Sequence, residues 1–549
     1  MIKILLTIIL YFSISGYSIV GKKLFLNKNN SSQFNNFDIF IGIFFLTFLS
    51  LILNLFFPLK IFNGFIIILG LIFFLYFFNK TIFNLSFIYL FILIIFFNLI
   101  ININQLATDS QVYHLQIIKW YNEYKTILGL SNIQIRFAMN SSWHHLLSLM
   151  HYEYKSTNTI YLINLIPLIA LFSEIFYMKK NNFFKLSNKF LISCAFFILI
   201  FSTIHPAQNG PILNMLGSPE VDIIGMVLFI LCFYYFLKFF ENKNSLNYFY
   251  LFLISILCIS IKLSYILSIL LFLITIFLYK KFFFENFKVL IILILFSFVW
   301  MLNSFFNSGC LIFPIKETCF NVIWSLDIEA INYFKNYDAT AFLRSKNNPV
   351  SFTNREYYLD SFKWFYPWVK NYLITSSFFL INIFIILLST SIIILNKSIF
   401  KKKIDAIKIY LSFIAFVIIF LIFWSMAPEF RYVLGIVISI SSFIFAIAIS
   451  IYQSKIIKWF YLINISLILL MSINLLKNFN QIFIKSNQFY AERHFDYSNF
   501  IFLSENNNFK FFYPDTRCAY FMNVCVYDKE NQYLEIKKKN GYYIFSKTN

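Results

Sequence analysis

The chain has 549 residues, of which 60% are hydrophobic and only 13% are charged, whereas a soluble globular protein carries about 25% charged residues. Its net charge of +21 gathers in the short segments between apolar runs, a distribution that argues against a nucleic-acid partner. Apolar runs of about 18 or more residues, long enough to cross a hydrocarbon layer about 30 Å thick, recur from end to end. These features exclude a soluble fold and predict an all-α polytopic membrane protein.

Hydrophobic spans follow one another along the whole chain. We expect about fourteen transmembrane helices, centred near residues 12, 47, 70, 92, 168, 198, 230, 254, 272, 295, 384, 417, 442 and 468. Lys and Arg gather in alternate loops, which assigns those loops to the cytoplasm. The opposite, outer face receives the mixed-charge loops 103–158, 205–220, 304–372 and 427–431.

The distribution of apolar residues also predicts two domains. A multi-span transmembrane domain covers residues 1–477, and a small α+β domain outside the membrane covers residues 478–549. Close cysteine pairs in the outer segments agree with this sidedness, because disulfides persist outside the cytoplasm. We expect one disulfide between Cys310 and Cys319 and another between Cys518 and Cys525, with four free thiols as the alternative.

The first outer loop concentrates ionisable residues beside the membrane surface, in "TDSQVYHLQIIKWYNEY". Residues 109–125 predict a helix that lies along this surface, with Asp109 as its N-cap. The side chains expected to face water on this helix are Gln116, Lys119 and Glu123. A second helix is expected to begin in "SSWHHLLSLMHY", capped by Ser141 or Ser142.

Asp109 and His114 are candidate functional residues in this loop. A carboxylate at the edge of an apolar bundle is costly unless it has a partner or a chemical role. The alternative for both residues is an ordinary interfacial helix whose polar side chains only meet the headgroups.

The pattern D-x-x-x-Y-H at residues 109–114 resembles the polyprenyl-phosphate-sugar-dependent glycosyltransferases of the GT-C superfamily. The chain is also similar to large bacterial membrane proteins of glycosyltransferase type, through "DSQVYHLQIIKWYNEYKTILGLSNI", "RFAMNSSWHHL", "LGSPEVD", "ISIKLSYIL", "NSGCLIFPI" and "APEFRYVLG". The resemblance implies a GT-C-like fold in the bacterial inner membrane, with its active site on the periplasmic face. It also implies that Asp109 is the catalytic base.

A lipid-phosphate donor needs cations near the outer headgroup plane to neutralise the departing phosphate. Lys262, in "CISIKLSYIL", lies between two apolar runs and is one candidate, with a lysine that merely extends to the surface as the alternative. Arg431, in "SMAPEFRYVLG", is the second, because its planar fork suits phosphate. The alternative for Arg431 is a local ion pair with Glu429.

The segment "NGPILNMLGSPEVD" ends in two acids that follow an interrupted outer loop. Two interpretations are open for this segment: it lines the sugar pocket, with Glu220 as a substrate-binding residue, or it caps the next helix, which is the favoured interpretation for Asp222. The complete set of predicted substrate-binding residues is His114, Glu220, Lys262, Glu429 and Arg431.

Together these residues predict an inverting glycosyltransferase that moves a hexosyl or pentosyl group from a polyprenyl-phosphate donor to a glycan or lipid acceptor. No cofactor is certain, although a divalent Mg or Mn ion at Asp109 is an alternative. A surface-polysaccharide polymerase or ligase is a second class, which relies on outer arginines and histidine. A lipid or glycan transporter is a third, which would place polar residues near the middle of the membrane.

Overall fold

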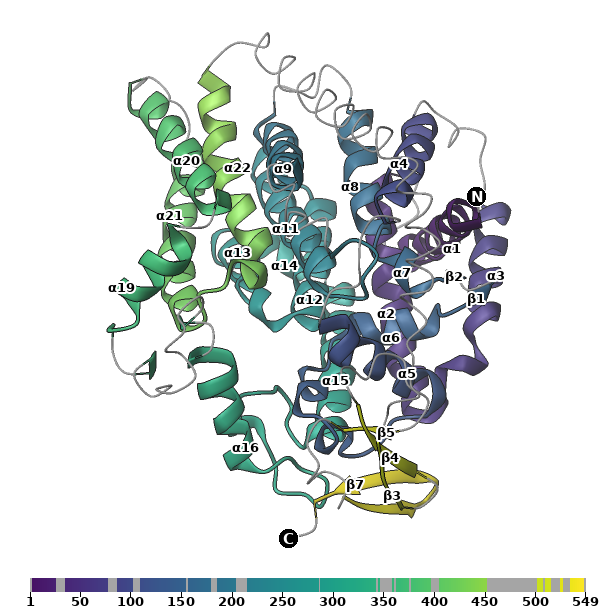
Figure 1. Ribbon diagram of the computed structural model, residues 1–549. Coiled ribbons are helices and arrows are strands. Elements are labelled where there is room, and N and C mark those ends of the chain that lie inside the picture. The colour runs from purple at the N-terminus through teal and green to yellow at the C-terminus, as the bar shows by residue number, and fades with distance from the viewer. Residues whose placement is uncertain are drawn as a thin grey trace, which may run out of the picture.

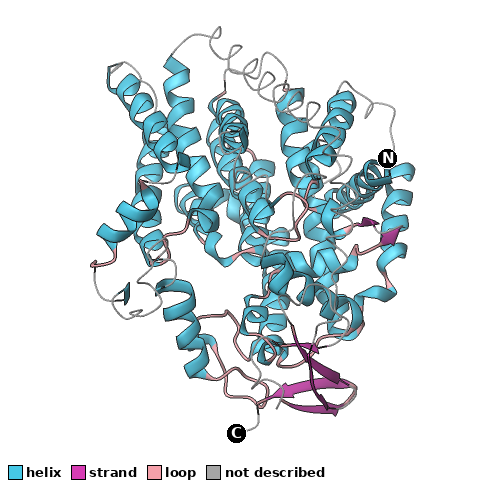
Figure 2. Ribbon diagram, viewed as in Figure 1, coloured by secondary structure: helices cyan, strands magenta, loops and turns pink. Residues whose placement is uncertain are grey.

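The computed structural model describes residues 2–25, 35–77, 86–101, 109–154, 157–178, 185–203, 215–285, 287–341, 344–345, 358–359, 362–374, 377–395, 404–451, 501–506, 509–514, 524–526 and 534–547. These residues form a bundle of helices with a small group of strands at one end (Figures 1 and 2). We refer to the end that carries strands β3 to β7, at the bottom of Figure 1, as the strand end. A mostly helical fold is what the apolar composition predicts.

The helices of the bundle are α1 (Ile2–Phe25), α2 (Ile39–Phe56), α3 (Asn63–Tyr76), α4 (Ser86–Ile101), α5 (Leu115–Glu123), α6 (Ser142–Leu149), α7 (Ile160–Ile163), α8 (Ile166–Tyr177), α9 (Leu186–Thr203), α11 (Asp222–Asn242), α12 (Ser245–Ile261), α13 (Leu267–Leu278), α14 (Lys280–Glu285), α15 (Phe287–Ser308), α16 (Ile328–Tyr333), α19 (Phe365–Trp368), α20 (Ser377–Leu395), α21 (Ile404–Met426) and α22 (Leu434–Ile451). Short 3-10 or π-helical turns that matter for the site are η2 (Asn36–Asp38), η5 (Ser110–His114), η9 (Leu263–Tyr265), η13 (Val369–Leu373) and η15 (Phe430–Val433).

Apolar helices occupy most of the predicted spans. Within the described residues, seven helical stretches are long and apolar enough to cross a membrane, and six shorter apolar helices accompany them. These segments correspond to the first thirteen predicted centres, whereas the span expected near residue 468 lies outside the described residues. The count of fourteen spans therefore stays a prediction.

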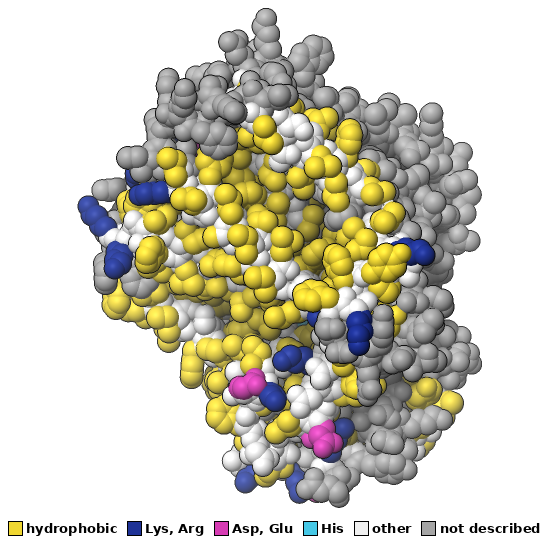
Figure 3. Space-filling model, turned by 90° about the vertical axis from the view of Figure 1, so that its left-hand side faces the viewer, with side chains coloured by type: hydrophobic (Ala, Val, Ile, Leu, Met, Phe, Trp, Pro, Cys, Tyr) yellow, Lys and Arg dark blue, Asp and Glu magenta, His cyan; other side chains and the backbone are white. Residues whose placement is uncertain are grey.

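The surface of the bundle agrees with a membrane environment. Figure 3 shows the side formed by α19, α20 and α21, where hydrophobic side chains cover a broad area and the charged ones lie at its margins and below it. Exposed apolar side chains recur on α21 at about one helical turn, at Ile407, Leu411, Ile414, Ile418 and Ile422. Such a continuous apolar face is unfavourable in water and favourable against hydrocarbon chains.

Close helix contacts at the N-terminal side depend on glycine. A Cβ atom on Gly16 of α1 would lie 1.9 Å from the carbonyl oxygen of Gly70 in α3. The two backbones can approach this closely only because neither residue has a side chain, as is common between helices in membranes. This contact joins the first and third helices into one unit.

Helix α5 is mostly buried, and the expectation that Gln116 and Lys119 face water is wrong, whereas Glu123 at its end is partly exposed, with 29% of its side chain accessible. Gln116 and Lys119 are each only 1% exposed. The helix packs against α6, where the Asn122 amide donates to the Ser148 carbonyl oxygen at 3.1 Å. The Trp120 ring lies near the rings of Phe509 and Phe545 in the C-terminal strands. The next helix, α6, begins as expected, since the Ser141 side chain accepts a hydrogen bond from the Trp143 backbone.

The C-terminal residues form strands that pack on the first long loop. Strands β3 (Ile501–Asn506), β4 (Phe509–Tyr513) and β5 (Val524–Cys525) form one sheet, and β6 (Glu535–Lys539) and β7 (Tyr542–Ser546) form a hairpin. The Leu128 backbone bonds to this hairpin on both sides, to the Tyr543 oxygen at 3.0 Å and to the Phe545 N–H at 2.9 Å. The predicted boundary between residues 477 and 478 lies outside the described residues.

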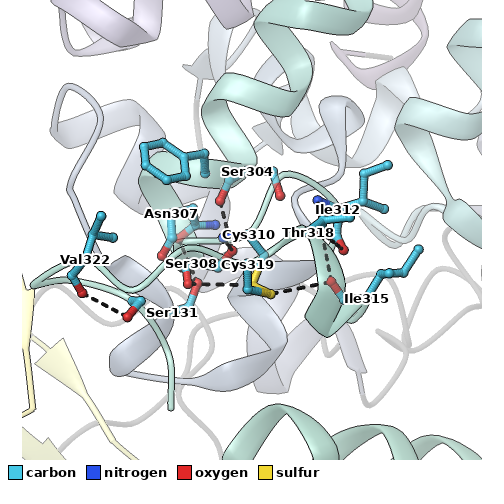
Figure 4. The surroundings of a disulfide bond; sticks show 12 residues. Ser131, Ser304, Asn307, Ser308, Cys310, Ile312, Ile315, Thr318, Cys319 and Val322 are labelled. Carbon is cyan, nitrogen blue, oxygen red and sulfur yellow. Dashed lines mark hydrogen bonds between the residues drawn. A yellow bond between two sulfur atoms is a disulfide. The ribbon is translucent and has the colours of Figure 1, made fainter. Parts of the chain in front are cut away.

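A disulfide joins Cys310 to Cys319, the first of the predicted pairs (Figure 4). The hydroxyl of Thr318 donates within this loop to the carbonyl oxygens of Ile312 and Ile315, at 3.0 and 2.8 Å. Cys525 is also disulfide-bonded, and its predicted partner lies outside the described residues.

Candidate functional site

Four charged side chains from distant parts of the chain meet as two ion pairs. Arg431 in η15 pairs with Asp109, which directly precedes η5. Lys262, between α12 and η9, pairs with Asp222 in the first turn of α11. The partners are 322 and 40 residues apart in the sequence, so only tertiary packing brings them together.

Asp109 does not cap the helix that follows it, and in this respect the sequence prediction is wrong. Its side chain makes no capping hydrogen bond and instead receives the Arg431 guanidinium. The guanidinium both neutralises the carboxylate and bonds to it, which a single backbone N–H cannot do. The side chains of Asp109 and Arg431 are 25% and 31% exposed. An incoming solute can therefore reach this pair.

Glu429 shapes the turn that presents Arg431. The Tyr372 hydroxyl, in η13, donates to the Glu429 carboxylate at 2.9 Å. The same carboxylate caps η15 by accepting the backbone N–H of Arg431 at 3.4 Å. The Arg431 guanidinium extends to Asp109 and pairs with it, in place of the local ion pair with Glu429 that the sequence offered as an alternative. Glu429 thus fixes the backbone from which the guanidinium extends.

The Lys262 ammonium is held inside the protein. Only 12% of its side chain is exposed, and only 4% of its partner Asp222. Burial lowers the pKa of Lys262, and the neighbouring Asp222 carboxylate opposes that change. The ammonium also lies 4.7 Å from the centre of the Tyr432 ring, a favourable cation–π contact. Because Tyr432 follows Arg431 directly, the two ion pairs adjoin.

Glu220 is the third acid of this cluster, and unlike Asp109 and Asp222 it forms no ion pair in the part of the chain that the structure describes. The residue is 0% exposed, and among the described residues neither of its carboxyl oxygens has a hydrogen-bond partner. Burial, followed by the charge of Asp222, raises the pKa of Glu220 to about 8, against the opposing effect of Arg431 and Lys262. Its carboxyl group is therefore protonated at neutral pH.

The whole cluster lies within a region that is shared with a protein family. A family model described as "Domain of unknown function (DUF8201)" matches residues 1–438. The chain belongs to this family. The matched region includes both ion pairs and Glu220 and leaves out the C-terminal strands. Neither the curated proteins nor the solved structures gave a match.

Two buried histidines adjoin the ion pairs in this DUF8201 protein. His114 Nδ1 and His144 Nε2 lie 2.7 Å apart, and both residues are 3% exposed. Burial lowers the pKa of each well below its ordinary value, and the charge of Arg431 lowers the pKa of His114 further. Both rings are therefore neutral at pH 7, and one ring donates its N–H to the other.

The described residues of this DUF8201 protein offer no set of metal ligands. In that part of the chain no three His, Cys, Asp or Glu side chains stand together in a way that could hold a metal ion. Asp109 and Asp222 instead face Arg431 and Lys262. Within the part of the chain that the structure describes, Asp109 therefore belongs to no group of three such ligands for the Mg or Mn ion considered there.

Sequence reasoning missed Asn164, which fixes the loop before α11. Its amide nitrogen donates to the carbonyl oxygens of Ser218 and Glu220, the latter at 2.9 Å. Its amide oxygen accepts the indole N–H of Trp143 at 2.6 Å. An asparagine within the apolar run "IYLINLIPLIA" was the available signal, since a buried amide needs partners.

His144 and the role of Asp222 were also missed. Asp222 was assigned as a helix cap, but α11 has no side-chain cap and the carboxylate bonds to Lys262. Nothing local in the sequence distinguishes a cap from an ion-pair partner 40 residues away.

Proposed function

We propose that the protein is a membrane glycosyltransferase of GT-C type that takes a sugar from a polyprenyl-phosphate donor. The observation that carries the proposal is the pairing of Asp109 with Arg431, beside Lys262 and Asp222. A carboxylate and two cations are the groups that a base-assisted transfer from a lipid phosphate requires. They lie at the ends of apolar helices, where a lipid headgroup would meet them.

Arg431 and Lys262 are proposed to bind the donor phosphate. In the resting site each cation is paired with a carboxylate. The entering phosphate replaces these carboxylates as the acceptor of the N–H donors of Arg431 and Lys262. Arg431 can hold two phosphate oxygens with its planar fork, and Lys262 adds a compact charge. Partial burial strengthens both contacts, because the local dielectric constant is lower than in water.

Asp109 is proposed to be the base that activates the acceptor. When Arg431 turns to the phosphate, the Asp109 carboxylate is released and can accept the proton of an acceptor hydroxyl. The hydroxyl oxygen forms a bond to the anomeric carbon from the opposite side as the bond from that carbon to the phosphate oxygen breaks. The configuration inverts, the proton stays on Asp109, and the phosphate leaves with its charge neutralised by Lys262 and Arg431.

The test compares Asp109→Asn with the parent protein for release of polyprenyl phosphate from a mixture of polyprenyl-phosphate sugars. Loss of a general base lowers such a rate by about a hundredfold to ten-thousandfold, and we expect a decrease in that range. Asp327→Asn, the same change at an exposed helix cap, is the matched control. Turnover that survives in Asp109→Asn contradicts the role of this base.

A polysaccharide polymerase or ligase is the second candidate, and the histidine pair favours it. His114 and His144 adjoin Arg431, and such enzymes rely on arginine and histidine at the outer surface. In that case His114→Ala abolishes turnover while Asp109→Asn retains it. The opposite result favours the carboxylate base.

A further inference from the structure

The backbone of Glu220 is fixed independently of its side chain. Asn164 binds the carbonyl oxygens on both sides of the turn, and Gly217, with φ +78°, allows the chain to bend into α11. Ser142 and Ser260, 2.8 Å apart, tie α6 to the last turn of α12 beside Lys262. The Glu220 carboxyl is therefore held in the cluster by the fold.

The charges around Glu220 balance without it. Asp222 lies on its own helix, while Asp109 and Tyr113 act on it from around η5, Lys262 from the end of α12, and Arg431 from η15. In each ion pair one acid neutralises one base. A negative charge on Glu220 would be a third one against these two cations, at a side chain that is fully buried. Burial and the neighbouring acids accordingly raise its pKa to about 8.

A protonated carboxyl group offers one O–H donor and one carbonyl acceptor side by side. Among the described residues, neither oxygen of Glu220 has a partner, although a buried polar group without one costs free energy. A hydroxyl group of a ligand both donates and accepts and therefore matches the two oxygens. A phosphate oxygen only accepts, and Arg431 and Lys262 already supply donors for it.

On the basis of the proposed function, we propose that Glu220 binds a hydroxyl group of the sugar as a neutral carboxylic acid. Glu220 is thereby a binding residue that positions the sugar, separate from the base Asp109. The site then has a charged part for the phosphate and a neutral part for the sugar. Ionisation of Glu220 would remove its donor and add repulsion toward the phosphate.

The first experiment measures affinity for undecaprenyl phosphate and for undecaprenyl-phosphate sugars, using the full-length protein in lipid nanodiscs. The sugar-dependent gain in affinity is expected to fall about tenfold in Glu220→Ala, because a hydroxyl loses its partner. Glu220→Gln, which is neutral and both donates and accepts, should keep the gain within about threefold. Undecaprenyl phosphate alone should bind all three proteins equally, and Glu123→Gln, at an exposed ion pair, is the matched control.

The pH dependence gives a second readout. The sugar-dependent gain in affinity of the parent should decline as the pH rises from about 7 to about 9.5, whereas the gain of Glu220→Gln should stay constant. A Gln variant that loses the gain, or that keeps the parent's pH dependence, overturns the inference.

An infrared difference spectrum between the parent and Glu220→Gln detects the proton without any ligand. A protonated carboxylic acid band at pH about 7, lost as the pH passes about 8, is expected from the raised pKa. Absence of that band with intact donor binding overturns the inference and leaves the proposed function standing. A band in a protein that neither binds nor turns over any sugar donor overturns the proposed function and, with it, the sugar assignment.

Discussion

Two buried polar clusters lie at opposite ends of the same helices and differ in how their acids are satisfied. At one end Asp38 of η2 accepts hydrogen bonds from the Lys22 ammonium, at 2.8 Å, from the Asn35 backbone, at 2.8 Å, and from the Tyr250 hydroxyl. At the other end Glu220 accepts none within the described residues. Tyr250 lies in the second turn of α12 and Lys262 follows its last residue, about 18 Å away along the helix.

This difference separates a structural cluster from a candidate site. The partners of Asp38 come from α1, from the residue before η2 and from α12, and each of its two oxygens accepts at least one hydrogen bond. Such an acid is complete without a ligand, and its removal should affect folding. Glu220 is buried to the same degree but incomplete, which is costly unless a ligand completes it. The following predictions are designed to break or sharpen this comparison.

The largest expected effect is on stability, from Lys22→Met. Only 10% of the Lys22 side chain and 3% of Asp38 are exposed, so the variant leaves a buried carboxylate without its cation. The free energy of unfolding should fall by about 3–5 kcal/mol. Denaturant-induced unfolding in detergent measures this change. Lys60→Met, at an ion pair where the lysine is 51% exposed, should lose only about 0–1 kcal/mol. Equal losses in the two variants would contradict a structural role for Lys22.

The next effect is on turnover, from the double variant Asp222→Asn/Lys262→Met. It removes both charges of one pair and leaves no buried charge alone, so the protein should fold while sugar transfer falls about a hundredfold. The matched variant Asp38→Asn/Lys22→Met, measured on the fraction that elutes as folded protein, should keep transfer within about threefold of the parent. A comparable loss of transfer in both would erase the distinction between the clusters.

A smaller effect is the pH dependence of stability that Glu220 confers. Its pKa is raised in the folded protein to about 8 from an ordinary value of 4.5, so the folded protein holds a proton that the unfolded chain releases between these values. This contribution is complete below about pH 4.5 and is lost as the pH rises through about 8, at up to about 1.4 kcal/mol for each pH unit. Between about pH 5 and about pH 8, the free energy of unfolding should therefore decline less in Glu220→Gln than in the parent, as measured by unfolding curves at each pH. Identical slopes would show that Glu220 is ionised in the folded protein.

The smallest effect is expected from Tyr372→Phe, which removes one hydrogen bond to Glu429. Stability should fall by about 1 kcal/mol, and transfer should fall modestly because the turn of Arg431 loosens. Thermal unfolding and turnover measure the two effects. Tyr366→Phe, at a residue that is 72% exposed, should change neither.

Some features of this protein are local, and the sequence predicts them. Long apolar runs become helices because an apolar helix satisfies its own backbone hydrogen bonds in a membrane. The cap of α6 was also predictable, because it is a local interaction: the Ser141 side chain accepts a hydrogen bond from a backbone N–H only two residues away. Charged residues in an otherwise apolar chain also marked Asp109, Lys262 and Arg431 as candidates, because such charges are costly without partners.

The surroundings of other polar side chains depend on distant parts of the chain and could not be predicted. Gln116 and Lys119 were expected in water, because the amphipathic pattern of α5 does not reveal that α6, further along the chain, packs against the helix. Asp222 was expected to cap a helix, because nothing near it indicates Lys262. A helix pattern states which residues share a face, but it does not state what lies opposite that face.

By itself the sequence determined that this chain is rich in long apolar helices of membrane type, and it marked Asp109, Glu220, Lys262 and Arg431 as candidates for the site. Only the tertiary structure decided that Arg431 meets Asp109, that Lys262 meets Asp222, and that Glu220 lies beside them. The physical reason is range. Backbone hydrogen bonding and hydrophobic burial act through composition and local spacing, whereas an ion pair forms only between atoms a few ångströms apart, which the packing of helices brings together.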